Sequence, residues 1–159
     1  MRKWEGFAVL FVFWSLLNSG SINSLTPDSE KESEEGYYLL LHDRFEKDGW
    51  EVELLDTARD ADYLSPVEKD VILSLNAVRT NPKKFAELYV RPVSKKFKGK
   101  IMVESGGRNI QTREGVKAVH LLYRKLRNTK KLPIQQPSRG LSRAAEDHAL
   151  DQAKTGRVG

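Results

Sequence analysis

The stretch Ser65-Pro66-Val67-Glu68 constrains the fold of this chain more tightly than any other. A serine before a helix accepts a hydrogen bond from a free amide of the first turn. Proline fits the first helical position, and a glutamate three residues after the serine bonds back to the serine amide. A helix is therefore predicted to begin at Pro66. It ends at Asn81, because a residue before proline is pushed out of the α region. Its buried stripe is predicted to consist of Val67, Val71, Ile72, Leu75 and Val78.

Three further helices are indicated by their capping residues. Asn81 caps a short second helix that includes Phe85 and Tyr89. Thr112 is expected to cap a third, with an apolar face formed by Val116, Val119, Leu122, Tyr123 and Leu126. Residues 91–111 between them are predicted to be mostly an exposed loop, with a short strand at 101–103 and a turn at 105–107.

The last helix follows Ser138 and ends at Gly156, where a glycine suits the left-handed conformation of a helix end. At about 100° per residue, its small residues share one face with a histidine. We expect this face to be buried against a neighbouring element that approaches closely. Its members are Leu141, Ala144, Ala145, His148, Ala149 and Gln152.

The chain of 159 residues, 39% hydrophobic and 31% charged, has the composition of a soluble globular protein. Its first 21 residues differ: a basic start, an apolar run over 7–17 and small residues at 19–21 are typical of a secretory signal peptide cleaved after Ser21. A core helix or an uncleaved membrane anchor is the alternative. Residues 22–64 are predicted to be an acidic leader and an arm whose aromatic residues pack on the domain, and 65–159 form the domain itself.

An exported chain without cysteine must be stabilised by packing alone, which favours a bacterial secreted, extracellular or periplasmic protein. No membrane-spanning segment is expected after signal cleavage. The net charge of +5 is better explained by a lipid or an anionic polysaccharide than by nucleic acid. Specific nucleic-acid binding is not expected, because no aromatic residues are interleaved with the basic ones. The candidate anion-binding residues are Lys95, Lys96, Lys98, Lys100, Arg124, Arg127, Lys130 and Lys131. A solvated surface is the alternative.

Three segments, taken in order, resemble the amino-terminal half of the CAP superfamily (cysteine-rich secretory, antigen 5 and pathogenesis-related proteins), in its cysteine-free bacterial form. They are Leu75-Asn76-Ala77-Val78-Arg79, the connector Leu132-Pro133-Ile134, and the segment from Gly140 to Ala149. The resemblance covers 65–159 and implies an α+β fold, an α-β-α sandwich of which this chain has mainly the helices. Residues 80–128 resemble an insertion found in some bacterial members.

The resemblance also implies a central cleft in which two His and two Glu of a complete domain bind a divalent metal. The first of those His would follow Gly159, and the others belong to later strands. The chain is therefore expected to be a CAP domain truncated before its sheet, with no catalytic residue, metal ligand or cofactor of its own. His148 is the one candidate for lining the cleft, although a hydrogen-bonded structural role is the alternative.

The residues themselves do not indicate an enzyme. His42, His120 and His148 are scattered along the chain, cysteine is absent, and no nucleophile elbow occurs. The sequence favours an extracellular binding or scaffold role. The alternatives are a metal-dependent or other hydrolase, protease-like, in a full-length protein, and a helical interaction protein whose basic surface binds anionic glycan or lipid.

Overall fold

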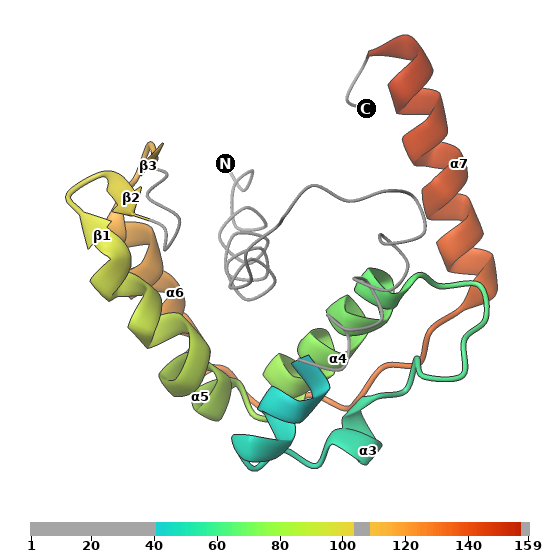
Figure 1. Cartoon of the computed structure of the whole chain (residues 1–159), viewed down its shortest axis with the longest axis horizontal. Helices are drawn as coiled ribbons and strands as arrows, with labels where there is room; N and C mark the ends of the chain where they lie inside the picture. Colours follow the sequence, from blue (N-terminus) through green and yellow to red (C-terminus); the bar gives the residue numbers. More distant parts are fainter. Residues whose placement is uncertain (1–40, 104–108, 157–159) are drawn as a thin grey trace.

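The computed structural model describes residues 41–103 and 109–156 (Figure 1). In these ranges the chain is mostly helical with one small antiparallel sheet, so the general α+β class is confirmed. The signal peptide, the 22–36 leader and the 105–107 turn lie outside the described residues. After helical residues 41–47 come α3 (Val52–Leu55), α4 (Pro66–Thr80), α5 (Pro82–Phe85), a π-helix η1 (Ala86–Val90), a 3-10 helix η2 (Arg91–Lys96), β1 (Phe97–Lys98), β2 (Ile101–Val103), β3 (Asn109–Gln111), α6 (Val116–Asn128) and α7 (Arg139–Thr155).

The predicted start and end of α4 are confirmed. The Ser65 amide donates to Glu68 Oε2 at 2.8 Å, and the Ser65 hydroxyl accepts from the Glu68 amide at 3.4 Å. Asn81 ends the helix, and its side-chain oxygen accepts from the Lys84 amide at 3.1 Å, which caps α5. Both helix starts therefore follow from side-chain chemistry that is local in sequence.

The predicted buried stripe of α4 is wrong for most of its members, although the partly buried Val78 packs against the core. Val67 and Val71 are 40% and 41% exposed, whereas α4 turns a mixed face inward. That face consists of Asp70, Leu73, Ser74, Asn76 and Ala77. One cause is the Leu55 carbonyl, which needs a donor and accepts from the Asn76 side-chain amide at 2.9 Å. Hydrophobic periodicity does not detect this requirement.

The arm that precedes α4 packs on the domain, as its aromatic content predicted. Phe45 is fully buried and stacks on Tyr89 of η1 with ring centroids 5.3 Å apart. The Trp50 indole donates to the Tyr89 hydroxyl at 2.9 Å, and this hydroxyl donates to Asp48 at 2.7 Å. Every polar group of this aromatic cluster therefore has a partner, and the cluster fixes helical residues 41–47 to the start of the α5 and η1 segment.

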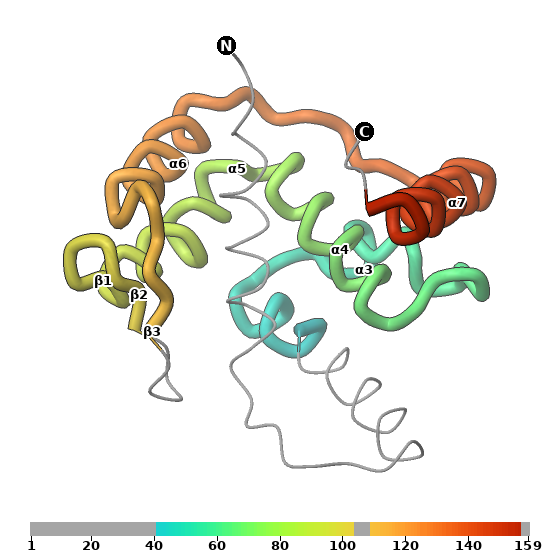
Figure 2. Tube along the Cα trace, turned by 90° about the horizontal axis from the view of Figure 1, so that it is seen from above, coloured from blue at the N-terminus to red at the C-terminus, as the bar shows by residue number. Residues whose placement is uncertain are grey.

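Three short strands connect η2 with α6. β1 pairs with β2, and β2 with β3, all antiparallel, so that Met102 lies opposite both Phe97 and Ile110 and is fully buried. In both views the sheet lies at one end of a layer formed by α5, η1, η2 and α6 (Figures 1 and 2). Over the described part of 91–111, the prediction of a loop is therefore wrong, whereas most of its residues are exposed as predicted and its strand at 101–103 is confirmed.

The third helix begins later than predicted. Thr112 does not cap it; its hydroxyl donates to the Lys100 carbonyl at 2.7 Å and accepts from the Gly115 amide at 3.1 Å. The N-cap is Gly115, which has φ = 65°. A side chain at Gly115 would place its Cβ 2.7 Å from the Gly99 carbonyl oxygen, so the close approach of the β1–β2 turn decides where α6 starts.

The last helix, α7, lies at the edge of the molecule opposite α6 and the strands (Figures 1 and 2). Gly156 ends it in the left-handed conformation, as predicted, but Ser138 makes no side-chain cap bond. Arg139 holds its first turn through an ion pair with Asp62 and a position 4.5 Å above the Tyr63 ring. None of its residues is buried, so the expected burial of its alanine face is wrong: no other element of the described chain covers that face.

Candidate anion-binding groove

An open groove of about 790 Å³ lies beside α6 and is bordered by α5. Residues of α6 that are three or four positions apart lie on one face of the helix, so a single face supplies most of the lining. Lys83 of α5 faces it from the other side. The lining residues are Lys83, Lys117, His120, Leu121, Tyr123, Arg124, Arg127 and Asn128.

Positive charge in the groove is largely uncompensated. No carboxylate lines it, and no ion pair involves Lys83, Lys117 or Arg124 in the parts of the chain that the structure describes. Cations held near each other without counterions raise the local concentration of anions around them. The groove is therefore the surface on which an anion would gain most from the described charges.

One carboxylate behind the groove positions Arg127. Glu87 of η1 accepts a 2.7 Å hydrogen bond from the Tyr123 hydroxyl and lies 3.5 Å from Arg127 and 3.2 Å from Arg91. The Tyr123 hydrogen bond first, and then the arginines, lower the pKa of Glu87. Arg127 also lies 5.6 Å from the Tyr123 ring centroid. An anion therefore meets an Arg127 that is already partly ordered, which reduces the entropy lost on binding.

Of the predicted anion-binding residues, only Arg124 and Arg127 line the groove. Lys130 and Lys131 are exposed just after α6 and directly before the connector. Lys95 and Lys96 belong to η2, and Lys98 to β1, and none of the three lines the groove. Lys100 is brought to the start of α6: a Cβ on Gly115 would lie 3.1 Å from Lys100 Cα.

Lys83 and Lys117 belong to the basic regions of the sequence but were not among the candidate anion-binding residues, and neither was His120. Lys117 could have been found, because it lies seven residues before Arg124 and hence on the same helical face. Lys83 could not, since its place depends on how α5 packs against α6. His148 is exposed on α7, with its Nε2 3.0 Å from Gln152 Nε2, and it does not line this groove.

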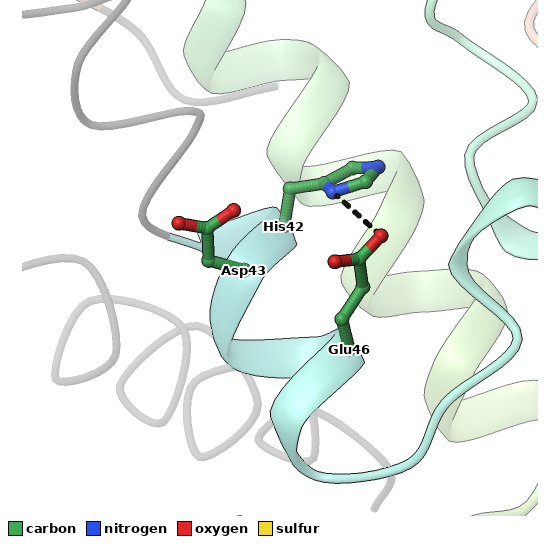
Figure 3. A group of neighbouring side chains, drawn as sticks. All are labelled: His42, Asp43 and Glu46. Carbon is green, nitrogen blue, oxygen red and sulfur yellow. Dashed lines mark ion pairs between the residues drawn. The ribbon is translucent and has the colours of Figure 1, made fainter.

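A second polar cluster is formed by His42, Asp43 and Glu46, whose ligand atoms lie within 4.8 Å of one another (Figure 3). His42 Nδ1 is 3.6 Å from Glu46 Oε1, and its Nε2 contacts the Arg59 guanidinium, which also donates to Asp56. Because a guanidinium group carries only donors, His42 Nε2 is the acceptor in its contact with Arg59. Arg59 thus occupies the Nε2 side of the His42 ring.

Close to this cluster, Asp70 of α4 is buried at 2% exposure and its Oδ1 has no hydrogen-bond partner. Burial, and next the negative charge of Asp56, raise the pKa of Asp70 from 3.8 to about 7. Arg59, from the same segment, forms an ion pair with Asp56 at 3.2 Å, and His42 Nε2 lies 4.0 Å from Asp56 Oδ2. Folding therefore forces Asp70 to hold a proton over most of the acidic range.

Asn76 and Arg79, from the segment that resembles CAP proteins, both bond to the connector. Asn76 Oδ1 accepts from the Gln135 amide at 2.8 Å, and its amide donates to the Leu55 and Gln135 carbonyls at 2.9 and 3.1 Å. Arg79 Nε donates to the Pro133 carbonyl at 3.0 Å, and the Arg79 carbonyl accepts from the Leu132 amide at 2.8 Å. These two residues are therefore structural: they fasten the connector to α4.

Comparison of the chain with protein-family models, curated proteins and solved structures finds no match. Among the described helices, none has both the length and the apolar character needed to cross a membrane.

Proposed function

We propose that this chain is an extracellular binding protein that holds an anionic ligand in the groove along α6. The observation that supports it is the cluster of cations without counterions, Lys83, Lys117 and Arg124, beside an Arg127 that Glu87 has positioned. Charged groups at such a surface increase the association rate and the specificity for partners of opposite charge. The apolar run near the amino terminus supports export.

We further propose that the helices belong to a CAP-type unit with a scaffold role. The support is local: Asn76 and Arg79 of α4 bond directly to the connector 132–135, so two of the three segments that suggested the family form one contact. The α-β-α sandwich, its cleft and a divalent metal belong to a complete domain of that family.

Binding of heparin to the full chain, measured by isothermal titration calorimetry, tests the anion-binding proposal. The double variant Lys83→Ala/Arg124→Ala removes two groove cations, and Lys47→Ala/Lys154→Ala removes two exposed lysines elsewhere. Since a tenfold change in affinity corresponds to 1.4 kcal/mol, loss of two contacts should weaken binding by about tenfold or more in the groove variant. Little change is expected in the control. Equal weakening in both variants would show that net charge, not the groove, binds heparin.

A further inference from the structure

We infer that the ligand is an extended acidic polysaccharide lying along α6 from Lys100 towards Lys131, and not a compact anion. This inference rests on the proposed function and adds the shape and class of the ligand. It follows from how the cations are arranged, from which backbone amides are already used, and from the neutral side chains between the charges.

The cations of α6 form a line and do not surround a point. Lys117 and Arg124 are seven residues apart, about 10 Å at 1.5 Å per residue, and the face from Lys117 to Asn128 covers about 16 Å. The tight packing of the β1–β2 turn against Gly115 adds Lys100 at one end. The exposed Lys130 and Lys131 continue from the other end. A linear ligand with repeated negative charges can use more of this row than a single phosphate can.

The backbone does not offer a compact anion site at the start of α6. Helix starts bind phosphate through free amides, but here the Val116 amide donates to the Gly99 carbonyl and the Ala118 amide to the Gly115 carbonyl. The Gly115 amide is used by Thr112. A small anion would therefore have to rely on side chains separated along the helix.

The groove is a poor match for a membrane surface or for single-stranded nucleic acid. Leu121, 44% exposed, is the one aliphatic lining residue, whereas a membrane-bound helix needs a broad apolar face. Tyr123 is the one lining residue of the Phe, Tyr or Trp type, and Arg127 lies over its ring while Glu87 accepts from its hydroxyl. Base stacking would require a free ring face.

The uncharged lining residues match the chemical groups of a sugar chain. His120 and Asn128 provide hydrogen-bonding groups between the cations, and Leu121 provides an apolar contact for the face of a sugar ring. Charge contacts at intervals, with neutral polar and apolar contacts between them, correspond to a polymer whose acidic groups alternate with hydroxyl-bearing rings.

The test is calorimetric titration of the full chain with heparin oligosaccharides of increasing length, with inorganic phosphate, and with oligothymidylate of matched charge. Affinity should rise with oligosaccharide length and level off once the row is covered, and phosphate should bind far more weakly. In Lys117→Ala/Arg124→Ala, the slope of log K against log salt should fall by about one for each cation removed. Lys47→Ala/Lys154→Ala should keep the slope.

The outcomes separate this inference from the proposed function. Length-independent binding, or phosphate binding as tightly as the longest oligosaccharide, overturns the extended ligand and leaves the anion-binding groove standing. Oligothymidylate binding as tightly as the oligosaccharide would show charge recognition alone, which also overturns it. If none of these anions binds, both the inference and the proposed function fail.

Discussion

The helices α6 and α7 have similar lengths, and only α6 is packed. α6 buries Val119 and sets Leu122, Tyr123 and Leu126 against the core, and it contacts α5, η1 and η2. α7 has a left-handed glycine at its end and many good helix formers, but no buried residue. The difference shows that local sequence can specify a helix completely without specifying its partner. The candidate groove lies on the packed helix.

The largest change in stability should come from the aromatic cluster of Phe45, Trp50 and Tyr89, which anchors residues 41–47 to η1. Phe45→Ala removes a fully buried ring that contacts both Trp50 and Tyr89, so the free energy of unfolding should fall by about 3–5 kcal/mol. Urea unfolding followed by Trp fluorescence measures it. A change below about 1 kcal/mol would mean that the arm is not part of the core.

The buried Asp70 should make the free energy of unfolding depend on pH. Because its pKa rises from 3.8 to about 7 on folding, the folded state binds this proton more tightly. The stability that protonated Asp70 contributes is complete below pH 4 and is lost as the pH rises to 7. At about 1.4 kcal/mol per pH unit, the loss is at most about 4 kcal/mol.

Asp70→Asn keeps the shape and removes the titration. The variant should match the original protein near pH 4 and be more stable than it above pH 7, in urea titrations across this range. Asp147→Asn, on the exposed α7, serves as the control and should leave the profile unchanged. If the stability of the Asp70 variant and of the original protein changed with pH in parallel, Asp70 would not hold the proton described above.

Substitution of Asn76 tests whether the connector is held in place by its hydrogen bonds to α4. Asn76→Ala leaves the Gln135 amide and the Leu55 carbonyl without their partner, so unfolding free energy should fall by about 1–3 kcal/mol. Asn128→Ala, at an exposed position, should change it little. Equal effects of the two substitutions would show that the connector does not depend on Asn76.

The smallest effect is expected on α7. Leu141→Ala shortens a side chain that is 75% exposed, so stability should change by less than about 0.5 kcal/mol. The matched substitution Leu73→Ala, at a fully buried position of α4, should cost about 2–5 kcal/mol. If Leu141→Ala also cost several kcal/mol, α7 would have a partner in solution and the contrast with α6 would disappear.

Sequence was a good guide wherever the cause was local. The capping box at Ser65, the Asn81 cap and the Gly156 end each depend on residues within one turn, and all were predicted correctly. The failures have distant causes. The Gly99 turn moved the start of α6 to Val116, and the Leu55 carbonyl bonds to Asn76 on the inward face of α4. No periodicity in α4 or α6 encodes those contacts.

The residues of the groove were likewise predictable only where their position depends on the local sequence. Charge on one helical face identified Arg124 and Arg127, and the same rule reaches Lys117. It could not reach Lys83, whose position depends on the packing of α5 against α6, nor exclude Lys95 and Lys98, which lie in η2 and β1. Clusters of charge in sequence indicate an anionic partner, and the fold decides which charges form one surface.

Hydrogen exchange of the full chain, with and without a saturating heparin oligosaccharide, tests the central claim most directly, since it reports on α6 and α7 at once. Ligand binding should slow amide exchange in α6, over residues 116–128, and in α5, and leave α7 unchanged. Protection confined to α7, with none in α6, would contradict the account, because it would place the ligand on the unpacked helix and not in the groove.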